Sequence, residues 1–120
     1  MRLFEAAGRA VRLDEEAMDA VTAVSGSGPA YLFYLAEAME QAAVRMGLEG
    51  HARLLVGQTL LGAATLLMQS EAGPAELRQR VTSPGGTTEA ALARLDARHV
   101  ANSVMEAVEA ARDRSVELGR

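Results

Sequence analysis

The sequence predicts an all-α protein, and three observations support that class. Alanine and leucine, which favour helices, supply much of the 49% hydrophobic content, whereas the chain has two Tyr, two Phe and no Trp. Apolar residues recur at helical spacing along most of the chain. Proline and glycine stand between these periodic segments. With 120 residues, the chain can form one domain with a core but not two.

The first expected elements are a helix from Asp14 and a long helix that begins at Pro29. Acidic residues 14–16 suit the first turn of the former, where the helix dipole favours negative charge. Its apolar stripe consists of Met18, Val21 and Val24, and the segment SGSG (25–28) ends it. Proline suits the first turn of the second helix, and Gly47 is a natural C-terminal stop.

The third expected helix, about residues 51–69, is apolar nearly all round. No charged residue occurs between residues 54 and 70, although this run is shorter than the roughly 20 residues that a membrane span needs. A helix of this kind is buried on several sides. Gly57 and Gly62 allow another helix to approach closely, so we expect an intertwined dimer. The alternative is an ordinary central core helix within one protomer.

Three further helices complete the expected fold. A short helix, PAELRQRV, begins at Pro74; a fifth helix covers about residues 87–95; and a final helix covers about residues 100–118. The apolar stripe of the final helix consists of Val100, Val104, Ala107 or Val108, Ala111 and Val116.

Composition excludes several classes of function. The net charge of −4 argues against nucleic-acid binding, which requires a basic face. The absence of cysteine excludes disulfides and thiolate catalysis. The N-terminal MRLFEAAGRA carries charge where a signal peptide needs an apolar core, so we expect a cytoplasmic protein with no membrane partner. His51 and His99 lie far apart in sequence and outside any metal-ligand pattern, so no metal site is expected.

The segment SGSGPAY (25–31) superficially resembles a dinucleotide-binding fingerprint. That fingerprint needs a third glycine or alanine where Tyr31 stands, and it needs a preceding strand, whereas the flanking segments here read as helices. Pro29 also removes an amide that could bind phosphate. A packed corner between two helices is therefore the better interpretation.

The segment SPGGTTEAAL (83–92) is the strongest candidate for a binding site. Glycine lets the backbone approach a ligand, Thr87 or Thr88 can cap the following helix, and the free amides of its first turn suit an anion. Ser83 and both threonines add hydroxyl donors. The absence of lysine and the acidic Glu89 favour a carboxylate over a phosphate. A plain proline–glycine turn capped by threonine explains the same residues. The residues alone slightly favour this interpretation over an anion-binding site.

Four segments in order resemble pyrroline-5-carboxylate reductase. They are DAVTAVSGSGPAYLFYLAEAMEQAAVRMGL, VGQTLLGAA, PAELRQRVTSPGGTTEAAL and EAVEAARDRSVELG, which together cover nearly the whole chain. The resemblance is to the C-terminal domain of that family only. It implies an interlocked helical dimerisation domain of the type found at the C-terminus of 6-phosphogluconate dehydrogenase. Residues 14–120 would form that domain, and residues 1–13 would be a remnant of the connection from a missing Rossmann domain.

The resemblance also implies an activity, which is the reduction of 1-pyrroline-5-carboxylate to L-proline, the last step of proline biosynthesis. NADPH or NADH would bind the missing domain, so we expect no cofactor on this chain and no activity from it alone. The substrate carboxylate would be held by Ser83, Gly85, Gly86, Thr87 and Thr88. Thr88 would be the catalytic residue, because its hydroxyl would hydrogen-bond the ring nitrogen of the substrate and relay a proton to it. The homodimer would assemble further, as the family often does, into a decamer.

Two other functions remain open at this stage. The chain could be a helical oligomerisation module without catalytic function. It could also be the matching domain of a dehydrogenase that acts on another imino or hydroxy acid.

Overall fold

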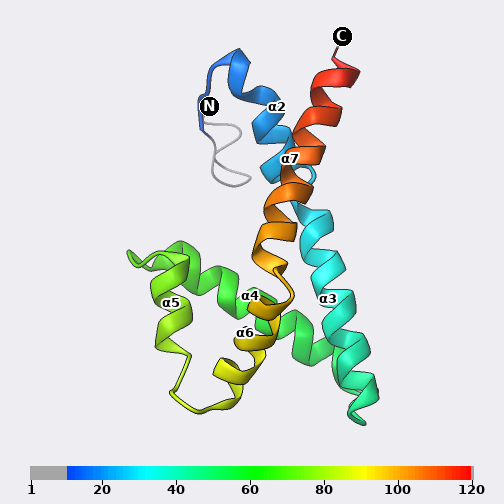
Figure 1. Ribbon diagram of the computed structural model, residues 1–120, viewed down its shortest axis with the longest axis vertical. Coiled ribbons are helices and arrows are strands. Elements are labelled where there is room, and N and C mark those ends of the chain that lie inside the picture. The colour runs from blue at the N-terminus through cyan, green and yellow to red at the C-terminus, as the bar shows by residue number, and fades with distance from the viewer. Residues whose placement is uncertain (1–10, 120) are drawn as a thin grey trace. The chain divides into compact units, whose positions relative to one another are not determined.

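Helices make up all the regular structure in the computed structural model, which describes residues 11–119 (Figure 1). No strand occurs among these residues, so the predicted all-α class is confirmed. The chain divides into two compact units, Met1–Gly28 with Met105–Arg120 and Pro29–Val104. Residues 1–10 of the expected connecting segment 1–13 lie outside the described residues.

In the first unit, three short turns replace the single helix expected from Asp14. They are the 3-10 turn η1 (Glu15–Ala17), the α-helix α2 (Met18–Val21) and the π-helical turn η2 (Thr22–Gly26). The Ser27 amide closes the π turn by donating to the Thr22 carbonyl at 2.8 Å. Of the predicted apolar stripe, Val21 is half-buried, whereas Met18 is 48% exposed and Val24 is 64% exposed, so the stripe is wrong at these two positions.

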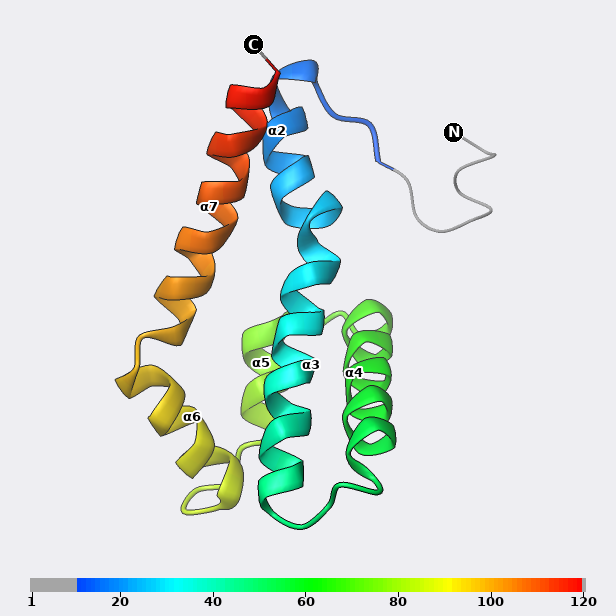
Figure 2. The ribbon, with the colours of Figure 1, turned by 90° about the vertical axis from the view of Figure 1, so that its right-hand side faces the viewer.

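The C-terminal part of α7 (Val100–Leu118) lies beside α2 in this unit (Figures 1 and 2). One polar contact joins these distant segments, because the Ser115 hydroxyl donates to the Asp19 carboxylate at 2.7 Å. Val108, Ala111 and Val116 of the predicted stripe are half-buried on α7. The stripe predicted from spacing is therefore confirmed at these positions.

The second unit begins with the long helix α3 (Gly28–Arg45), which contains Pro29 in its first turn as predicted. Gly47 ends it with φ +88°, and the Leu48 amide reaches back to the Ala43 carbonyl at 2.9 Å. This pair of features is a Schellman motif, in which glycine adopts the left-handed conformation at low steric cost. The predicted C-terminal stop is confirmed.

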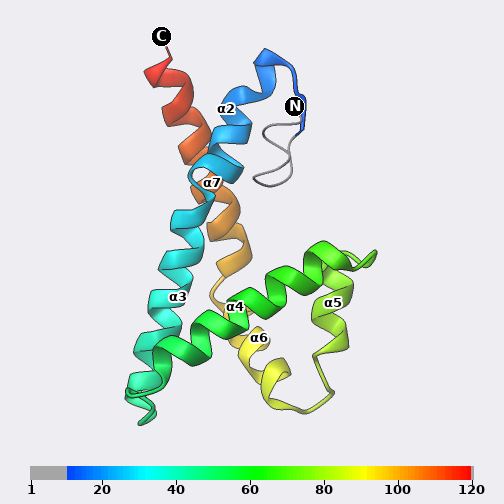
Figure 3. The same ribbon diagram turned by 180° about the vertical axis from the view of Figure 1, so that it is seen from behind.

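The next helices, α4 (Ala52–Gln69) and α5 (Pro74–Arg80), confirm two further predictions. Figure 3 shows α4 running away from the end of α3 and reaching α5 at its far end. The connection is fixed locally, because the Ala72 amide donates to the Ser70 hydroxyl at 3.0 Å. Pro74 then starts α5, where its missing amide hydrogen costs no helical hydrogen bond.

Helix α6 (Thr87–Ala97) meets α7 through a junction of only Arg98 and His99. His99 has φ +56°, a left-handed conformation that is uncommon for residues other than glycine. Its amide donates to the Asp96 carbonyl at 3.0 Å, and its carbonyl accepts from the Ser103 amide at 3.0 Å. His99 therefore ends one helix and starts the next.

Large apolar side chains remain exposed in the protomer. The buried apolar residues among those described are small: Ala23, Ala43, Ala52 and Val56. By contrast, Leu54 on α4 is 71% exposed. None of the described helices combines the length and apolarity that crossing a membrane requires.

Candidate functional site

The loop between α5 and α6 is a tight turn built by Pro84 and Gly85. Gly85 has φ +73°, and the Gly86 amide donates to the Ser83 carbonyl at 3.0 Å. Proline at the second position and a positive-φ glycine at the third are typical of a type II β-turn. A Cβ atom on Gly86 would stand 3.2 Å from the Ser83 carbonyl oxygen, so this position also favours glycine.

Gly86, rather than a threonine, is the N-cap of α6. Its backbone is extended, with φ −90° and ψ −176°, and no side chain caps the helix from this position. The expectation that Thr87 or Thr88 caps the helix is therefore wrong. The reason is geometric, because the turn ends in extended backbone at Gly86 and both threonines already occupy helical positions.

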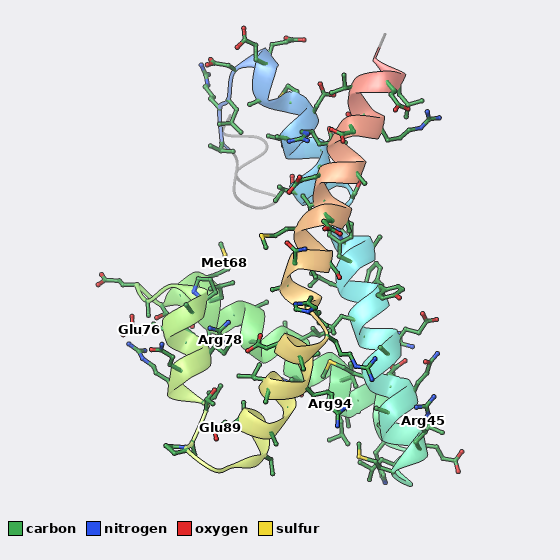
Figure 4. The ribbon with its side chains drawn as sticks, in the orientation of Figure 1. Arg45, Met68, Glu76, Arg78, Glu89 and Arg94 are labelled. Carbon is green, nitrogen blue, oxygen red and sulfur yellow. The ribbon has the colours of Figure 1, made fainter. Side chains whose placement is uncertain are left out.

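Glu89 supplies the interaction that the threonines do not. Its carboxylate accepts a hydrogen bond from the Gly85 amide at 3.2 Å. Figure 4 shows Glu89 beside the loop that joins α5 to α6. Sequence reasoning treated Glu89 only as a negative charge. Glu89 stands three residues after the N-cap, where an acid in a capping box accepts from the N-cap amide. Here the Gly86 amide is bound to Ser83, and Glu89 accepts from Gly85, one residue earlier.

Hydrogen-bond donors remain free at the start of α6. In the described part of the chain, the amides of Thr87, Thr88 and Glu89 have no acceptor, as expected for the first turn of a helix. The hydroxyls of Ser83, Thr87 and Thr88 also form no hydrogen bond there. Thr88 is half-buried, whereas Ser83 and Thr87 are exposed. All these donors belong to the turn and to the first turn of α6 that follows it.

The two glycines contribute shape rather than donors. The Gly85 amide is held by Glu89 and the Gly86 amide by the Ser83 carbonyl. An anion at this turn would therefore contact the amides at the start of α6 and the free hydroxyls. An 11-residue helix with its positive dipole end at this point favours such an anion.

The nearest arginine in sequence is engaged elsewhere. Arg80 donates to the Glu76 carboxylate at 3.2 Å on the exposed surface of α5. Arg78 and Arg94 lie away from the loop along α5 and α6 (Figure 4). Amides and hydroxyls without a guanidinium suit a singly charged carboxylate better than a highly charged phosphate.

The other sequence candidates do not form sites with this loop. SGSGPAY lies between η2 and the body of α3, so a helical turn precedes it where a nucleotide fingerprint needs a strand. His51 is the N-cap residue of α4, and His99 forms the α6–α7 junction. Within residues 11–119, no group of acidic and histidine side chains could hold a metal ion.

Comparison with known proteins gives a consistent result. The family model for pyrroline-5-carboxylate reductase dimerisation matches residues 15–118. The pyrroline-5-carboxylate reductase of Pseudomonas aeruginosa is 53% identical over 119 residues, which cover 98% of this chain and 44% of that protein. The corresponding protein of Synechocystis is 46% identical, with 98% and 45% covered.

Solved structures agree with the sequence comparisons. Plasmodium falciparum pyrroline carboxylate reductase with NADP bound has a TM-score of 0.91 and 34% identity, covering 99% of this chain and 47% of its own. A Coxiella burnetii pyrroline-5-carboxylate reductase has a TM-score of 0.84 and 42% identity, covering 89% and 40%. The chain thus spans less than half the length of these relatives. It belongs to the pyrroline-5-carboxylate reductase family and corresponds to that family's dimerisation domain.

Proposed function

We propose that this chain is the dimerisation and substrate-binding part of an enzyme that reduces 1-pyrroline-5-carboxylate to L-proline. The observation that carries the proposal lies at the α5–α6 turn, where the amides of Thr87, Thr88 and Glu89 and the nearby hydroxyls have no acceptor among the described residues. No arginine among these residues is hydrogen-bonded to the turn. The substrate carboxylate would lie at the start of α6. It would contact the amides of Thr87, Thr88 and Glu89 and the hydroxyls of Ser83 and Thr87.

Thr88 is the proposed catalytic residue. It is half-buried, and its hydroxyl has no acceptor among the described residues. A carboxylate held at the first turn would place the attached ring beside this turn, so the Thr88 hydroxyl could hydrogen-bond the ring nitrogen and relay a proton to it. Gly85 and Gly86 would act on the substrate only through the shape of the turn.

Hydride would come from NADPH or NADH bound by a separate Rossmann domain preceding residue 14. The related enzyme of Plasmodium falciparum was solved with NADP bound. The nicotinamide supplies the reducing chemistry when it is bound, and this chain's residues orient the substrate. We therefore expect the 120-residue chain alone to bind no dinucleotide and to show no reductase activity. We place the protein in the cytoplasm.

Self-association of this domain is supported by the match to a dimerisation model and by the exposed apolar side chains of α4. A Cβ atom added to Gly57 or Gly62 would meet no other atom within 4 Å, so both positions are open to a second helix. We propose an interlocked homodimer that can assemble further into a decamer. A stable monomer in light scattering would contradict this.

The direct test is calorimetric titration of the chain with L-proline and with a carboxylate lacking the ring. Binding of either ligand supports the proposed site. If neither ligand binds, the proposed site is wrong. In the protein joined to its cofactor domain, Thr88→Ala should lower kcat/KM for 1-pyrroline-5-carboxylate by about 100-fold, in the usual range for a lost proton-transfer group. Thr88→Ser keeps the hydroxyl and should retain most of the activity.

The same assay distinguishes the two remaining functions. A non-catalytic oligomerisation module would bind neither ligand, and its Thr88 variants would behave like the wild type. A dehydrogenase of another imino or hydroxy acid would fail on 1-pyrroline-5-carboxylate while remaining sensitive to Thr88→Ala on its own substrate.

A further inference from the structure

Glu89 places a negative charge at the turn to which the proposed function assigns the substrate carboxylate. Its Oε1 atom lies 3.2 Å from the Gly85 amide nitrogen. The side chain is exposed and takes no part in the ion pairs found among the described residues. Among the described residues, no cation pairs with this carboxylate, and its hydrogen bond to Gly85 places it at the turn.

This contact has a structural effect on the turn. Gly85 has positive φ, and its amide is the donor that hydrogen-bonds the Glu89 carboxylate. Holding that amide fixes the position of Gly85 relative to the first turn of α6. Because Gly86 follows directly and caps the helix, the free amides of Thr87 and Thr88 keep one arrangement.

The same contact has an electrostatic effect on any bound anion. The Glu89 amide is one of the free donors at the start of α6. An anion bound to that amide would therefore lie beside the same helical turn as the Glu89 carboxylate. Two charges about 6 Å apart in water repel enough to lower affinity about threefold, and a doubly charged ligand suffers this factor twice. The penalty thus grows with ligand charge.

We propose that Glu89 is a positioning residue that also limits the charge of the ligand. Its carboxylate holds Gly85, which shapes the turn, and its charge admits a monoanionic carboxylate while disfavouring a dianion. The inference rests on the proposed substrate site. A simple helix cap would change stability alone and would not separate ligands by their charge.

The experiment measures anion affinity by calorimetry on the 120-residue chain at one low ionic strength, since salt screens exposed charges. The probes are cyclopentanecarboxylate, a monoanion, and sulfate, a dianion. Glu89→Gln removes the charge but keeps an oxygen that can accept from Gly85. Glu89→Asp keeps the charge but shortens the reach to Gly85. Glu49→Gln, on the exposed α3–α4 connection, makes the same charge change elsewhere.

For Glu89→Gln, we expect affinity to rise about threefold for cyclopentanecarboxylate and about tenfold for sulfate. Glu89→Asp should weaken cyclopentanecarboxylate about threefold, as for one lost hydrogen bond, without improving sulfate. Glu49→Gln should leave the ratio of the two affinities unchanged. Circular dichroism of each variant checks that the fold is kept.

The outcomes separate this inference from the proposed function. If the wild type binds cyclopentanecarboxylate but Glu89→Gln improves both ligands equally or neither, the role of Glu89 is wrong and the site stands. If neither wild type nor variant binds either anion, the site and the role of Glu89 both fail.

Discussion

The Ser115 hydroxyl donates a 2.7 Å hydrogen bond to the Asp19 carboxylate and so joins segments that are 96 residues apart in sequence. The contact is half-buried and links α2 to the C-terminal part of α7. A hydrogen bond to a charged acceptor contributes more than one between neutral groups, and burial reduces competition from water. Ser115 therefore ties together two distant segments of the chain within one unit.

Ser115→Ala should lower the free energy of unfolding by about 1–2 kcal/mol, because Asp19 loses its donor while half-buried. Urea denaturation at one fixed protein concentration measures the change. A double-mutant cycle with Asp19→Ala should give a coupling free energy of about 1 kcal/mol. Additive effects of the two substitutions would contradict the contact.

His99→Gly should raise the free energy of unfolding by about 0.5–1 kcal/mol, because glycine adopts the left-handed conformation without the steric cost that a β-carbon brings. The native φ at this position is +56°. Thermal denaturation provides the measurement. His99→Ala keeps the β-carbon and should show no such gain, so equal stabilisation by both substitutions would refute the explanation.

Gly85→Ala should cost about 1 kcal/mol of stability and should also weaken carboxylate binding, because alanine is strained in the left-handed region. The φ of Gly85 is +73°, and the type II turn would relax towards another form. Calorimetry with L-proline and urea denaturation report the two effects. The matched control is Gly50→Ala, where φ is not in that region and an added Cβ would meet no atom within 4 Å.

Gly62→Leu should dissociate the proposed dimer. A Cβ added at this position would meet no neighbouring element of the protomer within 4 Å, so the position is open to a second chain that a larger side chain would obstruct. Sedimentation equilibrium of the wild type, Gly62→Ala and Gly62→Leu should show progressively weaker association. An unchanged dimer with leucine would place the partner on another surface.

The helix boundaries were largely predictable because local chemistry sets them. Pro29 and Pro74 start helices, and Gly47 ends one through a left-handed conformation that its missing side chain permits. The final helix was predicted with the bounds that the structure has, Val100–Leu118. In these places the sequence neighbours alone determine the outcome.

The details of the turn were less predictable because they depend on register. A shift of one residue decides whether Gly86 or Thr87 becomes the N-cap, and both are acceptable there. The type II turn settles the register, and it leaves Glu89 where it can reach Gly85. The residue types of the loop therefore indicated a candidate anion site, whereas the identity of the free amides and hydroxyls depends on the three-dimensional structure of the turn.

The π turn and the strain at His99 were not predictable. A π turn depends on how the surrounding helices accommodate an extra residue, which apolar spacing does not reveal. Histidine adopts the left-handed region more often than most residues, but that conformation is still uncommon for it, so His99 by itself did not predict a positive φ.

The small size of the buried core has a kinetic consequence. A protomer whose buried apolar residues, among those described, are three alanines and a valine gains little free energy by folding before it meets a second copy. On the proposed dimer, encounter between chains is then part of the folding reaction itself. The refolding rate should rise with protein concentration, and dilution alone should favour the unfolded chain.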